Sequence, residues 1–196
     1  MQKNENPVIL AVIVFAITAV AALVLAAANN LTVEKIEANT IKEQNEARME
    51  VMPDVKDFEK LDAEFDNASV TEIYAGKNPL GEVAGYCVGV NVNGFGGAID
   101  MIVGVDTENT VTGVKIISMS ETPGLGSKAQ EPKFNDQFIK KNASKPLKVI
   151  KSGIIDDDEI VAISGATVTS NAVTSGVNAA VDAVNNLNQG GAANAD

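Results

Sequence analysis

The chain has 196 residues, of which 45% are hydrophobic and 21% charged, with a formal net charge of −11 and a sequence pI near 4.4. This balance fits a globular body and excludes a disordered or collagen-like chain. It also argues against nucleic acid as a partner, because binding a phosphate backbone requires a basic surface. There is no His and a single Cys, Cys87, so catalytic triads, haem attachment, iron–sulfur clusters and most transition-metal sites lack their ligands. We therefore predict no metal site, and any redox chemistry must use an organic cofactor.

The first segment predicts a membrane span. Residues Val8 to Ala28 carry no charge and, as a helix, match the bilayer core of about 30 Å. The alternative is a cleaved signal peptide, because Lys3 precedes the run and three alanines end it at Ala28. The apolar core of a signal peptide has only about 7–15 residues. We therefore predict an uncleaved anchor over residues 1–30.

The side of the membrane is a separate question. Lys35, Lys42 and Arg48 follow the span and only Lys3 precedes it, so the charge count alone places the body in the cytoplasm. The acidic residues between these charges and the very short N-terminal tail weaken that argument. The family resemblance described below favours an extracytoplasmic body, which is the side we predict.

Residues 31–62 are predicted to form a helical stalk. Leu31 to Met52 lacks Gly and Pro and is rich in Glu, Lys, Gln and Ala, and Pro53 ends the helix. A second short helical patch is expected over Val55 to Leu61. The body then extends over residues 63–188, and the Gly- and Ala-rich end, 189–196, is predicted to be a flexible tail.

The body begins with strands. Apolar residues alternate along three runs: Tyr86, Val88, Val90 and Val92; Ile99, Met101, Val103 and Val105; Val114 and Ile116. Asn93-Gly94 and residues 106–109 supply hairpin turns between them, so the runs predict an antiparallel sheet. Cys87, inside the first run, is expected to be a buried small hydrophobic residue rather than a reactive thiol.

Helices and further extended segments follow. A short helix is predicted from Pro132 to Lys141, and extended segments over residues 147–150 and 160–163. Val173, Val177, Val181, Val184 and Leu187 recur at helical spacing, which predicts an amphipathic helix from Ser170 to about Asn188. The fold class is therefore α+β: a transmembrane helix and a helical stalk, then an antiparallel sheet with packed helices.

The segment Ser164 to Ser170 lies between the last extended run and this helix. A helix N-terminus presents unpaired N–H groups and a positive dipole end, so an anion bound there is stabilised. Gly165 and Ala166 allow close approach, and the hydroxyls of Ser164, Thr167, Thr169 and Ser170 offer donors. An equally physical alternative is that Thr169 and Ser170 are ordinary cap residues and Gly165 an ordinary turn residue.

The same stretch resembles the Ser/Thr-Gly-Ala-Thr flavinylation motif of the FMN-binding domain family. In that family a threonine carries FMN through a phosphoester bond, made by a separate flavin transferase that uses FAD. The resemblance implies that Thr167 is the attachment residue, with Ser164, Gly165, Ala166, Thr169 and Ser170 around it. Many members have an acidic residue three positions before the motif, where this chain has Val161.

A second match is the run Glu121-Thr122-Pro123-Gly124-Leu125-Gly126, which resembles another signature of the family. The Pro-Gly pair predicts a turn, and Gly126 is expected to let the backbone pass close to a planar ring. Glu121, Thr122, Gly124, Leu125 and Gly126 are therefore the second set of expected FMN contacts. Without the Thr167 motif, an ordinary strand-ending loop is the simpler interpretation.

Together the motifs resemble the G subunits of Rnf-type ferredoxin:NAD oxidoreductases more than the longer NqrC subunits of sodium-pumping quinone reductases. The resemblance implies an electron-relay subunit in a complex that couples electron transfer from ferredoxin to NAD with Na⁺ or H⁺ movement. Its partners would be the other membrane subunits of that complex and, during maturation, the flavin transferase. The alternatives are an NqrC-like subunit, a free-standing extracellular flavoprotein reductase, and an anchored scaffold without redox function.

Overall fold

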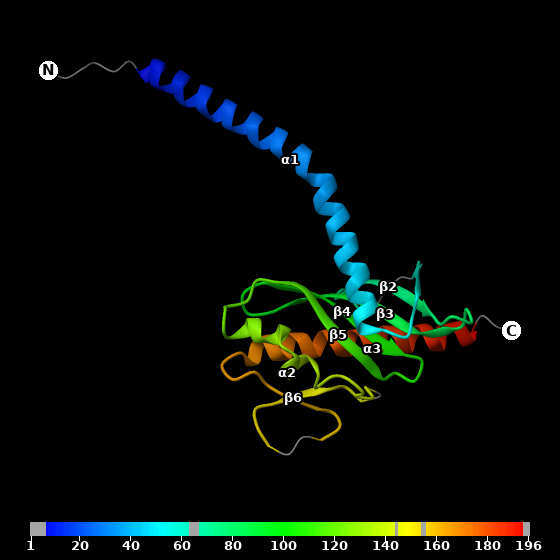
Figure 1. Cartoon of the computed structure of the whole chain (residues 1–196). Coiled ribbons are helices and arrows are strands. Elements are labelled where there is room, and N and C mark those ends of the chain that lie inside the picture. The colour runs from blue at the N-terminus through cyan, green and yellow to red at the C-terminus, as the bar shows by residue number, and fades with distance from the viewer. Residues whose placement is uncertain (1–6, 63–66, 144, 154–155, 194–196) are drawn as a thin grey trace. The chain divides into compact units, whose positions relative to one another are not determined.

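The computed structural model describes residues 7–62, 67–143, 145–153 and 156–193. The chain divides into two compact units, Met1–Glu43 and Gln44–Asp196. The elements follow one another along the chain as helix, five strands, two short helices, two short strands and a long helix (Figure 1). Their bounds are α1 Pro7–Val51, β1 Asp57–Leu61, β2 Val70–Lys77, β3 Val83–Asn93, β4 Ala98–Asp106, β5 Val111–Met119, η1 Gly126–Gln130, α2 Pro132–Asn135, β6 Lys148–Ile150, β7 Glu159–Val161 and α3 Thr167–Ala193.

Helix α1 contains the predicted span. Its segment Pro7–Asn29 has a mean hydropathy of 3.2, is long and apolar enough to cross a membrane, and none of its most apolar stretch is buried in the protein. The helix continues from this segment to Val51. A helical stalk is therefore present up to that residue.

The predicted helical patch over Val55 to Leu61 is wrong. Residues Asp57–Leu61 form strand β1, which pairs antiparallel with β2, Asp57 opposite Lys77. Val55, Phe58 and Leu61 recur every third residue, a spacing that resembles a helix when the chain is considered alone. The partner strand decides the outcome, because β2 offers backbone groups that β1 satisfies along its whole length.

The predicted antiparallel sheet is confirmed. Strands β1 to β5 lie in sequence order in one sheet, and every neighbouring pair is antiparallel. The turn between β4 and β5 is closed by Asp106, whose Oδ1 accepts the N–H groups of Glu108 and Thr110, each at 2.8 Å. Asn109 in this turn has φ +63°, a conformation that Asn tolerates well.

One face of the sheet packs on α3, as Figure 1 shows. Val88, Val103 and Val105 from the strands and Val173, Val177 and Val184 from the helix all belong to this main core and are fully buried. The predicted amphipathic helix is thus confirmed, but it begins at Thr167 and extends to Ala193. Residues 194–196 of the expected tail lie outside the described residues.

The last turns of α1 pack on the other face of the sheet. Ala47, Val51, Met52 and Val55 form a second cluster with Cys87 and Ile102. Gly104 and Gly113 make room for this approach: a Cβ on Gly113 would lie 2.9 Å from Val51 Cα, and one on Gly104 2.8 Å from Val51 O.

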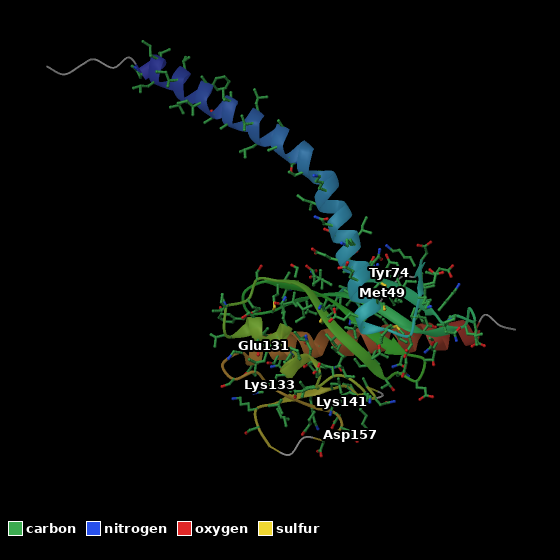
Figure 2. All side chains as sticks on the ribbon, viewed as in Figure 1. Met49, Tyr74, Glu131, Lys133, Lys141 and Asp157 are labelled. Atoms are coloured by element: carbon green, nitrogen blue, oxygen red, sulfur yellow. The ribbon has the colours of Figure 1, made fainter. Side chains whose placement is uncertain are left out.

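A buried arginine ties this end of α1 to the sheet. Arg48 is 4% exposed, donates to Glu72 Oε1 at 2.9 Å, and places its guanidinium carbon 3.7 Å from the ring centre of Tyr74. Figure 2 labels Tyr74 close to the last turns of α1, which carry Met49. A charge this deeply buried requires such partners, so the helix end is held in a defined place on the sheet.

Two other expectations need correction. The helix predicted from Pro132 to Lys141 is shorter: α2 ends at Asn135 and turns continue to Lys141. Phe134 and Phe138 still meet edge to face in the core, so burial of these rings, rather than a longer helix, orders the segment. The two late extended runs are present as β6 and β7, but they pair with each other in parallel as a separate two-stranded sheet.

Candidate functional site

Both sequence motifs line one pocket of about 460 Å³. This volume lies in the usual range for small-molecule sites, roughly 300–1,000 Å³. Its walls come from the β3–β4 turn, the loop after β5, and the start of α3. The lining residues are Phe95, Glu121, Thr122, Leu125, Gly126, Gly165, Ala166, Thr167, Val168 and Thr169.

The start of α3 forms the polar end of the pocket. The first bond of the helical ladder is donated by Ser170 N–H to Ala166 O at 3.0 Å. The amides of Thr167, Val168 and Thr169 therefore precede the ladder, at the positive end of a helix of 27 residues. Gly165 has φ +78°, a left-handed conformation that suits glycine and turns the chain into the helix. Such a terminus matches the requirements of a phosphate group.

Thr167 is the first residue of α3, whereas the sequence predicts a loop at this position. Because the helix begins three residues earlier than predicted, the hydroxyls of Thr167 and Thr169 lie in its first turn. Thr167 is partly exposed and lines the pocket, whereas Thr169 is only 1% exposed. The accessible hydroxyl is therefore that of Thr167.

Apolar side chains form the open part of the pocket. Phe95, Val168 and Leu125 line it and are 75%, 53% and 44% exposed. Large apolar groups rarely gather on a surface unless they meet a ligand or a partner. A flat aromatic ring is the kind of ligand that such walls bind, so the pocket combines an apolar part with an anion-binding end.

Glu121 and Thr169 are joined across the pocket wall. Thr169 Oγ1 donates to Glu121 Oε2 at 3.0 Å, and Glu121 Oε1 accepts the N–H groups of Phe95 at 2.7 Å and Gly96 at 3.1 Å. Thr169 is therefore not an ordinary N-cap residue. Ser170 is not one either, because its Oγ accepts from Ile163 N–H and donates to Ala166 O.

Three of the expected site residues do not line the pocket. Ser170 is fully buried and its hydroxyl is used within the fold. Ser164 is exposed outside the lining, and Gly124 has φ +76°, with no atom within 4 Å of the place that a Cβ would occupy. Gly126 lines the pocket for a different reason than expected: a Cβ there would lie 2.3 Å from Glu121 Oε2, so its small size accommodates the carboxylate.

Two lining residues were missed. Val168 stands inside the first motif, but its apolar side chain did not indicate a contact. Phe95 lies in the turn closed by Gly94 N–H donating to Gly97 O at 2.8 Å. An aromatic residue between glycines in a predicted hairpin turn is an available signal, because a turn exposes it to solvent without an evident structural reason.

The fold and this pocket define a class: an α+β domain with an anion-binding helix terminus beside apolar walls. Residues 94–182 match the family model described as FMN-binding domain, and both motifs fall inside that range. A solved structure from Parabacteroides distasonis, that of the C-type component of its Na(+)-translocating NADH-quinone reductase, is similar in fold. It has a TM-score of 0.51 and 22% identity, covering 66% of this chain and 78% of that one.

Relatives over nearly the full length identify the family. The G subunit of the Na(+)-translocating ferredoxin:NAD(+) oxidoreductase complex of Acetobacterium woodii is 39% identical, covering 92% of each chain. The G subunit of the proton-translocating ferredoxin:NAD(+) oxidoreductase complex of Clostridium ljungdahlii is 32% identical, covering 87% of this chain and 88% of the relative. The chain belongs to the family of G subunits of Rnf-type ion-translocating oxidoreductases.

Proposed function

We propose that the protein is a membrane-anchored electron carrier that holds FMN covalently through Thr167. The observation that carries this proposal is the convergence of both motifs on one pocket, with a helix N-terminus at the Thr167 end. The membership of the G-subunit family supports the cofactor and the relay role. FMN, when bound, accepts electrons and passes them on.

The residues of the pocket divide into two groups by chemistry. The amides of the first turn of α3 and the left-handed Gly165 suit the phosphate. Phe95, Leu125 and Val168 offer the apolar surface that a planar ring requires. In the attachment step, Thr167 Oγ1 would form a bond to the FMN phosphorus of FAD, and AMP would leave. A flavin transferase is therefore the proposed partner during maturation.

The protein is proposed to work in an assembly with other membrane subunits. Its role there is to relay electrons on the path between ferredoxin and NAD, coupled to Na⁺ or H⁺ movement, the two ions that the relatives' names mention. The apolar helix segment Pro7–Asn29 supports a single membrane span. We further propose that the body from residue 44 lies on the extracytoplasmic side, where a covalent bond prevents loss of the cofactor.

Intact mass measurement tests the attachment. The full chain, purified from cells that contain the transferase, should gain the mass of one FMN less one water. The yellow colour should remain with the protein after denaturation, which an anchored scaffold without flavin does not predict. A mass equal to that of the bare chain would remove the covalent cofactor from this protein, and fragmentation that locates FMN elsewhere would remove Thr167.

A further inference from the structure

The carboxylate of Glu121 connects two segments that are far apart in sequence. Its Oε1 accepts from the backbone N–H groups of Phe95 and Gly96, and its Oε2 accepts from Thr169 Oγ1 at 3.0 Å. Phe95 is 26 residues before Glu121 and Thr169 is 48 residues after it. Both oxygens are thus occupied, one by the β3–β4 turn and the other by the first turn of α3.

Two glycines make room for this connection. A Cβ on Gly94 would lie 2.1 Å from Glu121 Oε1, and a Cβ on Gly126 would lie 2.3 Å from Oε2. Real Cβ atoms do not approach so closely, so any other residue at either position would displace the carboxylate. The backbone around Glu121 is therefore adapted to the carboxylate rather than to a ligand.

We propose that Glu121 is a positioning residue that sets the separation between Phe95 and Thr167 across the pocket. It acts through the turn that carries Phe95 and through Thr169, two residues after Thr167, and it does not bind the flavin phosphate. Its two oxygens already have donors, and a carboxylate repels a phosphate. The connection itself is a property of the fold, whereas its effect on the flavin rests on the proposed function.

The Glu121 carboxylate also places a negative charge on the pocket wall. Reduction adds negative charge to a flavin, so a fixed carboxylate in the same pocket opposes reduction. Gln at this position keeps the size but removes the charge, and its amide offers one acceptor and one donor group in place of two acceptors. Thr169→Val keeps the charge and removes only the hydroxyl donor. The two variants therefore separate the charge from the connection.

The first experiment measures amide hydrogen exchange in the full chain without covalent flavin, using Thr167→Val as the background. Adding Glu121→Ala should increase exchange at Phe95 and Gly96 about tenfold or more, because a lost hydrogen bond of about 1.4 kcal/mol corresponds to that factor. Exchange in β4 should stay unchanged. Glu131→Ala is the matched control, since Glu131, labelled in Figure 2, is exposed and makes no side-chain capping bond.

Unchanged exchange at Phe95 and Gly96 in the Glu121→Ala variant would overturn the connection. If exchange instead rises throughout the body, the variant has lost its fold, and Thr169→Val decides the question. A rise confined to the β3–β4 turn in Thr169→Val supports the connection between that turn and α3. No rise there in Thr169→Val contradicts it.

The second experiment measures the midpoint potential of the flavin in chains with Thr167 intact. Glu121→Gln should raise the potential, and Thr169→Val, which keeps the charge, should raise it less. Equal potentials for Glu121→Gln and the parent would overturn the effect on the flavin, and equal shifts in both variants would reduce Glu121 to a structural role. If the parent carries no flavin, the proposed function fails, while the exchange experiment still decides the connection.

Discussion

The hydroxyl of Thr167 is the single atom group on which the attachment depends. It lies at the first position of α3 and is partly exposed to the pocket. Thr167→Val keeps the shape of the side chain but removes the acceptor oxygen, so covalent flavin should be lost completely. The free energy of unfolding should change by only about 0.5 kcal/mol, as expected for a partly exposed position. Intact mass and thermal unfolding of the variant check both parts.

Thr169→Val is the matched control for this variant. Thr169 belongs to the same turn, but its hydroxyl is buried against Glu121. This variant should retain covalent flavin. Flavin on the Thr167→Val chain, or its absence from the Thr169→Val chain alone, would show that Thr167 is not the attachment residue.

Cys87 should be inert in the folded protein. It is 1% exposed, and burial raises the pKa of its thiol from 9.0 to about 12, with the nearby Arg48 charge lowering the pKa only in part. The thiolate is the reactive form, so alkylating reagents at pH 8 should label the protein only after denaturation. Labelling of the native chain at the rate of a free thiol would contradict the burial.

The same shift has a consequence for stability at high pH. The folded state holds the thiol proton more tightly than the unfolded chain, so this contribution to stability is fully present below pH 9. It is lost as the pH rises towards about 12, where the unfolded thiol has ionised and the folded one has not. Replacing Cys87 with Ala removes that part of the pH dependence, which denaturant titrations at pH 8 and pH 10.5 can compare.

The loop after β5 is an element whose two glycines, Gly124 and Gly126, have different roles. Gly126→Ala would bring a Cβ to 2.3 Å from Glu121 Oε2 and 2.8 Å from Thr169 Oγ1, so it should displace the carboxylate. The absorbance and midpoint potential of the bound flavin should therefore shift. Gly124→Ala meets no atom within 4 Å and costs only its left-handed backbone, about 1–2 kcal/mol.

These two variants separate the ring environment from general disturbance of the loop. Gly124→Ala should be less stable but should keep the flavin spectrum of the parent. A spectral shift in Gly124→Ala together with an unchanged Gly126→Ala would place the ring on the opposite side of the loop from the pocket described above.

The end of α1 depends on a sheet surface without side chains. At Gly113, a Cβ would lie 2.9 Å from Val51 Cα, a backbone atom that no side-chain rotation moves. Gly113→Ala should therefore lift the last turn of α1 from the sheet and destabilise the body by about 1–3 kcal/mol, the usual cost of overpacking. Chemical denaturation of the full chain measures this loss. An unchanged midpoint would show that the contact contributes little to stability.

At the scale of the whole molecule, the position of the body relative to the membrane is the main prediction. The charge count around the span favours the cytoplasm, and the family resemblance favours the other side. Protease added to intact spheroplasts should digest the body from residue 44 onward while a cytoplasmic marker remains intact. Protection until lysis would place the body inside. An N-terminal sequence beginning near Asn29 would replace the anchor with a cleaved leader.

Much of the fold follows from patterns between near neighbours in the chain. The alternation in β3 and β4, the hydropathy of Pro7–Asn29 and the helical spacing along α3 each correspond to an element of the structure. These patterns work because the periods of strands and helices determine which side chains share a face. The error at β1 has the same origin, since its apolar spacing resembles a helix and only pairing with β2 makes it a strand.

The pocket illustrates the division between sequence and tertiary structure. The two motifs indicate by themselves that Thr167 and the loop from Glu121 to Gly126 belong to one site, because each contains residue types suited to part of the same cofactor. Which of those residues face the pocket was decided only by packing: Phe95 joins the wall, Ser170 is turned into the fold, and Glu121 bonds to groups 26 residues before and 48 residues after it. Local patterns specify backbone conformation, whereas hydrogen bonds over such separations exist only after the sheet and α3 have brought the segments together.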